Sequence, residues 1–340
     1  MDIRILSDKD TDRWEQFVEG CPDATFFHKA GWKKVLELAY GHKTHFLFAE
    51  QDGEIEGVLP LGHIKSFLFG NHLTSTPFCV YGGIAATTDA ARDALKTAAC
   101  QLADDLRVDH LELRNLTSGG DGWPTKDLYV TFKKEIDADS EVNLKNIPRK
   151  QRAMVRKGIK AGLHGEIDGD IERLYQVYSE SVRNLGTPVF PKKYFKVLQS
   201  VFKDDCDILT ITKDGELVAS VLSFYFRDQV LPYYGGGLAS ARSVQGNDFL
   251  YWELMCRAAE RGCRVFDFGR SKEGTGSYSF KKHWGFEPTP LYYEFYLVKA
   301  TELPDLNPLN PKYQRFIKLW KKLPVAVSQR LGPFLSRSLG

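Results

Sequence analysis

The chain has 340 residues and a mass of 38.6 kDa, which predicts two domains rather than one. Its formal charge of +2, with 43% hydrophobic and 26% charged residues, is typical of a folded globular protein. This composition excludes a globally basic nucleic-acid coat protein and an acidic disordered protein.

Three further sequence features bear on the class of protein. The charged start lacks the apolar core of a secretory signal, and no run of 18 apolar residues predicts a membrane-spanning helix. Six scattered cysteines without a Cys-x-x-Cys pair predict reduced thiols and no metal site. We therefore expect a cytoplasmic protein.

Periodicity and turn residues predict the elements of the first half. Asp52-Gly53 between two apolar runs predicts a hairpin. We expect helices at 8–19, 29–39 and 88–106. Strands are expected at 45–50, 55–64, 73–80, 110–114 and 128–134.

The second half repeats this order, with Asp214-Gly215 as the hairpin turn and Asn247 as a helix cap. Helices are expected at 146–161, 170–184, 192–202 and 247–262. Strands are expected at 207–212, 217–226, 229–234, 265–268 and 291–298. The repeated order predicts a duplicated α+β domain, although two unrelated hairpins could share Asp-Gly-Glu. We expect domains at 1–140 and 141–300, then a basic amphipathic tail at 301–340.

This tandem layout resembles the Fem family of GNAT-type transferases, which transfer amino acids to peptidoglycan precursors. It is most similar to the FemAB-related members that accompany exosortase/PEP-CTERM systems. The segments that carry the resemblance are Arg183–Pro191, Phe266–Ser271, Gly274–Gly276, Phe280–Gly285 and Asn310–Tyr313. The resemblance implies an α+β fold of two tandem GNAT-like domains, with mixed, mainly antiparallel sheets flanked by helices.

The resemblance also implies an N-acyltransferase that binds no cofactor and uses acyl-CoA or aminoacyl-tRNA as co-substrate. Its acceptor would be an amine of cell-envelope or exopolysaccharide metabolism, either a small molecule or a lipid- or nucleotide-linked one. Two alternatives remain open: a Fem-type, aminoacyl-tRNA-dependent peptidoglycan-precursor transferase, and a non-catalytic scaffold for polysaccharide or protein-sorting machinery.

The cationic segment after the strand at 265–268 is the first candidate site. Cations and free amides suit a phosphorylated or carboxylated ligand, whereas the alternative is an ordinary solvated loop. By resemblance, Lys281 or Lys282 contacts the acceptor's phosphate. The other expected substrate-binding residues here are Arg270, Gly276 and Trp284, and the candidate catalytic residues are Asp267 and Tyr278.

Two other segments are expected to bind the acceptor or a polyanion. By resemblance, Thr187 and Phe190 border the acceptor groove, unless they form only a rigid loop. Arg149 and Arg152 fall on one face of a helix in a segment, 142–165, that has seven Lys or Arg and no acid. Such a face attracts tRNA, a nucleotide diphosphate or lipid phosphate, and its alternative is a solvated basic surface.

The donor is expected near a glycine-rich turn before the helix at 247–262. GNAT enzymes hold the pyrophosphate of coenzyme A at this place, but Arg242–Asn247 departs from their glycine pattern. The donor therefore stays open, and a plain turn with a helix cap is the alternative. The expected donor-binding residues are Gly236, Gly237, Arg242, Gly246 and Asn247.

The tail from 310 to 340 has seven Lys or Arg and no acid, interleaved with apolar residues. Trp320 beside Lys321-Lys322 predicts an interfacial anchor, so we expect peripheral contact with an anionic inner membrane. A helix docked on the protein would have the same pattern.

Overall fold

Two eight-stranded sheets organise the chain in the computed structural model, which describes residues 1–67, 69–120, 122–304 and 311–339. Unit 1 comprises Met1–Tyr129, Pro290–Asp305 and Phe334–Gly340, and unit 2 comprises Val130–Thr289 and Leu306–Pro333. These units differ from the expected boundaries, because 290–305 joins unit 1 although it follows unit 2 in the chain. The predicted α+β class of two mixed, mainly antiparallel sheets flanked by helices is confirmed.

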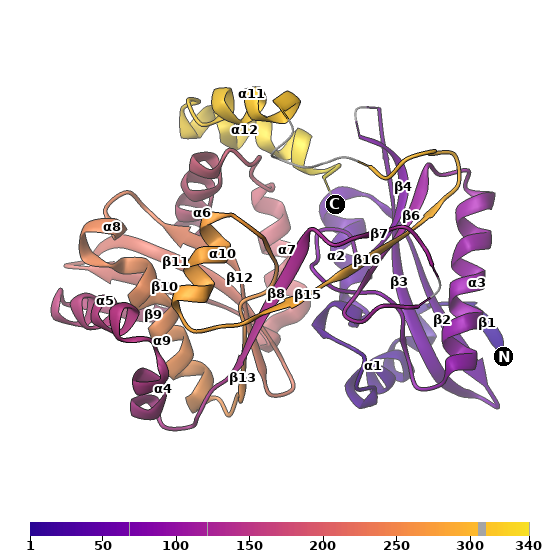
Figure 1. The fold of residues 1–340 in the computed structure, drawn as a ribbon, viewed down its shortest axis with the longest axis horizontal. Coiled ribbons are helices and arrows are strands. Elements are labelled where there is room, and N and C mark those ends of the chain that lie inside the picture. Colours follow the sequence, from indigo (N-terminus) through magenta and orange to yellow (C-terminus); the bar gives the residue numbers. More distant parts are fainter. Residues whose placement is uncertain (68, 121, 305–310, 340) are drawn as a thin grey trace. The chain divides into compact units, whose positions relative to one another are not determined.

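Unit 1 has a sheet whose strands follow the order β1-β2-β3-β4-β6-β16-β7, with β5 paired to β3. The helix α3 covers one face through Leu95 and Ala99, and α1 stacks Trp14 on Phe46 of the opposite face (Figure 1). The elements are β1 Asp2–Ile5, α1 Thr11–Gly20, α2 Gly31–Tyr40, β2 Lys43–Gln51, β3 Glu54–Ser66, β4 Gly70–Ser75, β5 Ala85–Ala86, α3 Asp89–Asp105, β6 His110–Asn115, β7 Thr125–Lys126 and β16 Tyr292–Leu297.

Unit 2 has a second sheet in the order β14-β8-β13-β12-β11-β10-β9, with β15 paired to β8. Its elements up to β11 are β8 Tyr129–Glu135, α4 Ser140–Asn146, α5 Arg149–Lys160, β9 Leu163–Ile167, α6 Ile171–Leu185, α7 Lys192–Phe202, β10 Cys206–Lys213 and β11 Glu216–Phe226. Those that follow are β12 Gln229–Gly237, α8 Ala241–Val244, α9 Gly246–Glu260, β13 Val265–Asp267, β14 Ser271–Lys272, α10 Gly276–His283, β15 Pro288–Pro290, α11 Pro311–Trp320 and α12 Val325–Ser336.

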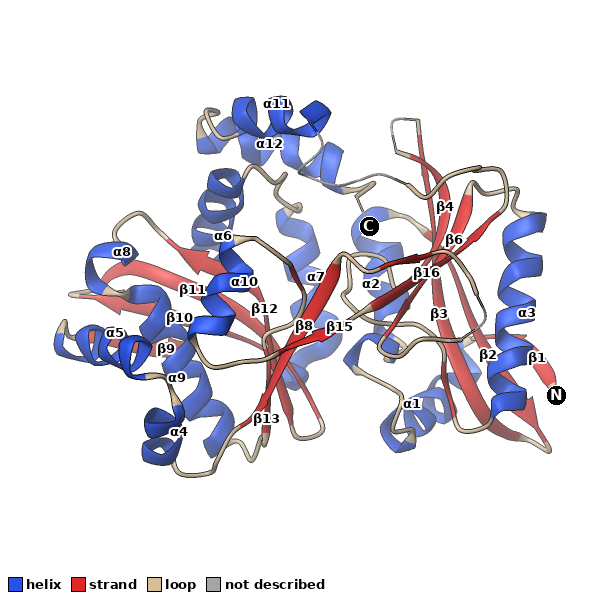
Figure 2. Cartoon of the chain, in the orientation of Figure 1, coloured by secondary structure: helices blue, strands red, loops and turns tan. Residues whose placement is uncertain are grey.

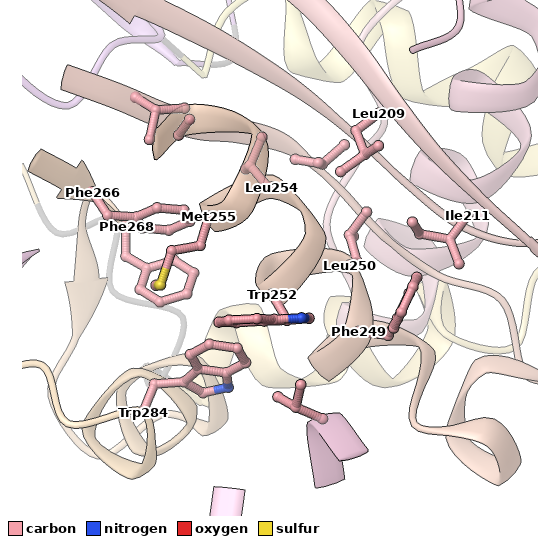
Figure 3. Packing of buried hydrophobic residues seen from close by; sticks show 14 of the residues in the cluster. Leu209, Ile211, Phe249, Leu250, Trp252, Leu254, Met255, Phe266, Phe268 and Trp284 are labelled. Atoms are coloured by element: carbon pink, nitrogen blue, oxygen red, sulfur yellow. The ribbon is translucent and has the colours of Figure 1, made fainter. Parts of the chain in front are cut away.

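The core of unit 2 lies between its sheet and α9 (Figure 3). Leu250 and Leu254 of α9 belong to one buried cluster with Leu209 and Ile211 of β10, and Trp284 closes this cluster below α9. The basic helix α5 packs on the outer side of α9, and α6 and α7 contact the strands β10 to β12 (Figure 2). The helix α9 therefore forms the layer that covers the sheet, and α5 forms a second layer on α9.

The predicted duplication is visible in the two sheets. The hairpins β2–β3 and β10–β11 occupy the same place in the strand order, and both turns have positive φ at Asp52-Gly53 and at Asp214-Gly215. In each sheet the next strand pairs in parallel with a strand that follows a helix, β4 with β6 and β12 with β13. The two units thus share one topology.

The strand next to the end of each sheet comes from the other half of the sequence. β16, expected as the final strand of the second domain, pairs antiparallel with β6 of unit 1. β8, which follows β7 of unit 1 in the chain, pairs antiparallel with β13 of unit 2. Each sheet therefore contains one strand from the other half of the sequence, β16 in unit 1 and β8 in unit 2, and the assignment of 291–298 to the second domain is wrong.

Three local predictions also need correction. The strand expected at 73–80 ends at Ser75, because Thr76 and Phe78 have positive φ, which a strand does not tolerate. The helix expected at 146–161 is α5, which begins only at Arg149 after Pro148, and the preceding short helix α4 was not expected. Asn247 is not a helix cap, since α9 begins at Gly246 after Gln245 in a left-handed conformation.

Among the described residues, no helix combines the length and apolar character needed to cross a bilayer. In the motif Asn310–Tyr313, residue 310 and the side chains of the next three residues lie outside the described part of the chain.

Candidate functional site

The two parallel strands of unit 2 diverge toward their carboxyl ends. β12 pairs with β13 only through Gln229 with Val265 and Val230 with Phe266. β12 then continues to Gly237 beside β11, whereas β13 ends at Asp267. The backbone groups of β12 beyond Val230 are therefore not paired to β13, and groups of this kind can hydrogen-bond an extended ligand between the strands.

Three glycines form the end of β12 where it approaches α9. A side chain at Gly235 would lie 2.5 Å from the carbonyl oxygen of Ser220, and one at Gly237 would lie 2.5 Å from Oδ1 of Asn247. Gly246, at the start of α9, is buried against Val218 and Ala241. These glycines are needed for close packing, which brings the turn 238–245 onto the start of α9.

The expected donor-binding residues lie in this turn or at the ends of β12 and α9 beside it, and they face different surroundings. Gly237, Gly246 and Asn247 lie together, and Oδ1 of Asn247 is buried with no hydrogen-bond partner among the described residues. A side chain at Gly236 would meet Ser181 of α6, and Arg242 is exposed on α8. The unpaired Oδ1 of Asn247 therefore lies at the start of α9, and Arg242 lies exposed on the preceding helix α8.

Lys281 projects from α10 into the protein rather than into solvent. Its Nζ donates to the carbonyl oxygens of Gly269 and Arg270, both at 3.0 Å, directly after β13. The side chain is 8% exposed and lies over the ring of Phe132 at 5.5 Å. Burial lowers the pKa of Lys281 from 10.5 to about 7, against a smaller opposing effect of Asp267. Lys281 is therefore a neutral or easily deprotonated amine near physiological pH.

Asp267 is buried at the end of β13, where its carboxylate contacts the protein's own backbone and a lysine side chain. Its Oδ1 accepts the backbone N–H of Gly269 at 2.7 Å, and its Oδ2 lies 3.4 Å from Nζ of Lys133. The ring of Tyr278 packs edge-on against Phe132. Thr275 caps α10, because its Oγ1 accepts a hydrogen bond from the backbone N–H of Tyr278. Asp267 thus shapes the turn that carries Gly269 and Arg270, while Tyr278 is half-buried beside it.

The remaining expected residues of this segment are divided between surface and core. Arg270 is half-buried, whereas Gly276 and Lys282 are exposed at the start and end of α10. Trp284 is fully buried, and its Nε1 donates to Oδ1 of Asp248 at 3.2 Å. Lys281 and Lys282 therefore do not share one cationic surface, and Trp284 belongs to the core.

The segment after α6 meets β12 through aromatic rings. Phe190 packs edge-on against Tyr234 at 5.6 Å and lies 5.2 Å from Tyr194, while the hydroxyls of Tyr194 and Tyr234 are 2.8 Å apart. Thr187 is exposed next to this cluster, and its backbone N–H bonds Val182. The structure thus brings Phe190 to the strand that diverges from β13, and the pattern of scattered tyrosines did not indicate Tyr194 or Tyr234.

The cations of α5 line a shallow surface pocket of about 470 Å³. Its lining is Arg149, Arg152, Ala153, Arg156, Lys157 and Lys160. Among the described residues, none of these cations forms an ion pair, and Nε of Arg152 is buried without a hydrogen-bond partner. The opposite face of α5, with Val155 and Gly158, packs on α9. The basic stripe is therefore held rigidly and carries uncompensated positive charge.

Unit 1 contains a polar cavity of about 480 Å³ that the sequence did not indicate. It lies where β6 ends and α3 begins. Only glycine fits at position 83, because the Cβ of any other residue would lie 1.8 Å from Oδ1 of Asn115. Asn115 donates to Glu294 of β16, and Arg92 forms a 2.6 Å ion pair with Asp23. The cavity occupies the place in unit 1 that the diverging strands occupy in unit 2.

The described residues include no group of three or more His, Cys, Asp or Glu side chains arranged for a metal ion.

Comparison with protein families identifies part of unit 2. Residues 145–282 match the family model for the acetyltransferase (GNAT) domain. No curated protein sequence matches the chain significantly. The matched range includes the diverging strands, the turn before α9 and Lys281.

Solved structures with the same fold cover nearly the whole chain. FemX aligns with a TM-score of 0.67 and 15% identity over 93% of this chain and 100% of its own. L-PGS from Bacillus licheniformis aligns with a TM-score of 0.56 and 16% identity over 94% and 100%. A tandem GNAT protein from the clavulanic acid biosynthesis pathway aligns at 0.55 and 13% over 88% and 99%. The chain therefore has a tandem GNAT fold.

Proposed function

We propose that the protein is an N-acyltransferase that moves an acyl or aminoacyl group from an activated donor to an acceptor amine in unit 2. The observation that carries the proposal is the divergence of β12 from β13 beyond Val230, next to the glycine-rich turn and the start of α9. Unpaired backbone groups in such an opening can bind an extended ligand, and residues 145–282 match the acetyltransferase (GNAT) domain. The acceptor then approaches from the side of Phe190 and Tyr234.

In the proposed reaction, the acceptor nitrogen attacks the donor carbonyl carbon and the bond from that carbon to sulfur or oxygen breaks. The attacking amine must lose one proton, and the departing thiolate or alkoxide must gain one. Neutral Lys281 can take the first proton, because two N–H groups bond Gly269 and Arg270 and its lone pair stays available. Backbone amides at the diverging strands can stabilise the oxyanion.

The role of Lys281 as a base differs from the role expected from the family resemblance, in which a charged lysine contacts the acceptor's phosphate. The two roles have opposite pH dependence, since a base must be neutral and a phosphate ligand must be protonated. Because the pKa of Lys281 lies at about 7, the base role requires activity to rise through this range. A phosphate-binding role requires activity to fall.

A second donor, aminoacyl-tRNA, is favoured by the basic face of α5. Four arginines and lysines at positions 149, 152, 156 and 160 follow one side of a rigid helix without acidic partners among the described residues. A stripe of this kind can bind successive phosphates of an RNA backbone. We propose cell-envelope or exopolysaccharide amines, as in exosortase-associated systems, as acceptors on the Fem resemblance.

Calorimetric titration with acetyl-CoA and with charged tRNA, followed by a transfer assay with amine acceptors, tests the proposal. We expect one donor to bind and Lys281→Met to abolish transfer while leaving donor binding within about two-fold. Arg149→Glu/Arg152→Glu should weaken tRNA binding at least about ten-fold and leave acetyl-CoA binding unchanged. Absence of binding by both donors would overturn the acyltransferase proposal and favour the non-catalytic scaffold.

A further inference from the structure

The C-terminal helices of unit 2 are docked on the protein through one face. Ile317 of α11 occupies the space beside Gly186, and Gly332 of α12 lies against Val189. Gln329 donates to Oγ of Ser179 at 2.8 Å. In Figure 1 the two helices lie beside α6, and this docked face holds them as a fixed part of unit 2.

Trp320 belongs to this docked face. It is 4% exposed and stacks with Phe316 at 5.3 Å, so its expected role as an interfacial anchor is wrong. Successive residues of an α-helix are rotated by about 100°, so Ile317 and Trp320, three positions apart, share the side of α11 that faces the protein. Any interfacial contact must come from other side chains.

Several other apolar side chains of the two helices are exposed to solvent. Leu319 is 68% exposed and Phe316 40% on α11, and Leu331 is 48% exposed and Val327 37% on α12. A docked helix normally turns such residues inward and polar residues outward. The two helices therefore carry apolar residues on their protein side and on their solvent side.

Exposed cations accompany these apolar residues along the chain. On α11 and directly after it, Lys318, Lys321 and Lys322 are exposed, and α12 adds the exposed Arg330. Within the described part of the chain, none of these cations forms an ion pair, and residues 310–340 contain no acid. We call this combination of Phe316, Leu319, Val327 and Leu331 with the four cations the tail surface.

We propose that the tail surface docks on a membrane surface rich in anionic lipids, with its apolar side chains at the headgroup boundary and its cations on the headgroup phosphates. Aliphatic residues next to unpaired cations fit this occupant. RNA would engage the cations but has no counterpart for Leu319, Val327 and Leu331. A second copy would bring like charges together.

The same helices contact the segment that borders the proposed acceptor groove. Gly186 and Val189, which pack under α11 and α12, flank Thr187 and precede Phe190. If the proposed transferase function holds, docking would present this groove to an acceptor carried on a lipid. Membrane binding itself does not depend on that function and is measured without any substrate.

Sedimentation of the full chain with vesicles tests the docking. We compare phosphatidylcholine vesicles with vesicles that contain phosphatidylglycerol as an added anionic lipid, at low and high salt. We expect binding to the anionic vesicles alone and a loss of binding at high salt. Lys318→Glu/Lys321→Glu/Lys322→Glu should weaken binding about 100-fold, since each cation near such a surface contributes roughly five-fold.

Two matched variants separate the tail surface from general effects. Lys193→Glu/Lys196→Glu/Lys203→Glu changes the same net charge at exposed positions of α7 and the turn after it, and should leave vesicle binding within about two-fold. Leu319→Gln/Leu331→Gln should weaken binding about ten-fold, whereas Leu38→Gln/Ile167→Gln, at similarly exposed positions, should not. Unchanged circular dichroism and melting confirm that each variant is folded.

Three outcomes would overturn the proposal. The first is a full chain that ignores anionic vesicles, and the second is an equal loss of binding in the α7 variant. The third is a concentration-dependent dimer, seen by analytical ultracentrifugation and abolished by Leu319→Gln/Leu331→Gln, which would make a second copy the occupant. Loss of transfer activity with intact vesicle binding would instead count against the proposed function alone.

Discussion

Lys281 shows how burial changes the chemistry of one side chain. The neighbouring Lys282 is exposed on the same helix. Lys281 instead lies against two backbone carbonyls and the ring of Phe132, where little water can solvate an ammonium. The result is an amine with a pKa of about 7 instead of 10.5.

This shift predicts a pH dependence of stability. Between about pH 7 and pH 10.5 the unfolded chain holds a proton on Lys281 that the folded chain has released, so the free energy of unfolding rises with pH in this window. The rise contributed by one proton is at most about 1.4 kcal/mol per pH unit. Urea unfolding at pH 7, 8 and 9 should show this slope, reduced in Lys281→Met. Lys282→Met is the matched control, and an equal slope in both variants would contradict the assignment.

Gly235 predicts a second residue-level effect. A methyl group there would lie 2.5 Å from the carbonyl oxygen of Ser220 and 2.8 Å from Cα of Val221, which are backbone atoms that cannot move without shifting β11. Gly235→Ala should therefore lower the free energy of unfolding by about 2 kcal/mol. Gly276→Ala, where nothing lies within 4 Å of the added methyl, should be neutral or slightly stabilising. Thermal and urea unfolding compare the two, and equal losses would refute the packing argument.

At the scale of elements, one carboxylate joins three helices of unit 2. Asp248 of α9 accepts hydrogen bonds from Gln151 of α5 and from Nε1 of Trp284 after α10. Burial raises the pKa of Asp248, and the two hydrogen bonds oppose this increase. The basic helix and the helix that carries Lys281 are therefore positioned through the same side chain.

Replacing Trp284 tests this connection. Trp284→Phe keeps an aromatic ring in the core but removes a donor from a buried carboxylate, so we expect a loss of about 1–3 kcal/mol in the free energy of unfolding. Trp320→Phe provides the control, because Nε1 of this buried tryptophan has no hydrogen-bond partner among the described residues. Chemical denaturation measures both. A cost no larger for Trp284→Phe than for Trp320→Phe would argue against the Asp248 connection.

For the whole molecule, the exchange of β8 and β16 makes each unit depend on the other half of the sequence. Tyr293 and Phe295 of β16 are buried in unit 1, and Glu294 bonds Asn115 and the backbone N–H of Gly119. A chain that ends before β16 lacks these contacts and leaves the edge of β6 unpaired. The duplication in sequence is therefore not a pair of self-sufficient domains.

This arrangement predicts the behaviour of fragments. A fragment of residues 1–140 should lack a cooperative unfolding transition, whereas the same fragment with residues 290–305 attached through a flexible linker should regain it. Near-ultraviolet circular dichroism and urea unfolding detect the difference, and a fragment with a scrambled 290–305 segment controls for length. If the fragment 1–140 alone unfolds cooperatively and has the near-ultraviolet circular dichroism of buried aromatic side chains, strand β16 is dispensable.

The sequence by itself determined the elements and their duplication. Hydrophobic periodicity, the two Asp-Gly turns and the glycine at the end of α6 act over a few residues, so helices, hairpins and the α+β class follow from local patterns. The placement of candidate site residues on the turn before α9, on α10 and on α5 follows in the same way. These patterns also predicted that the cations at 149, 152, 156 and 160 share one face.

Only the tertiary structure decided which sheet β8 and β16 join and which polar groups are buried. A strand's alternation does not specify its partner, so β8 and β16 could not be assigned to their sheets from their residues. Adjacent lysines look alike in sequence, yet a rotation of 100° per residue places Lys281 inside and Lys282 outside. Trp284 and Trp320 are buried for the same reason, because burial depends on what packs against a helix face and not on the face alone.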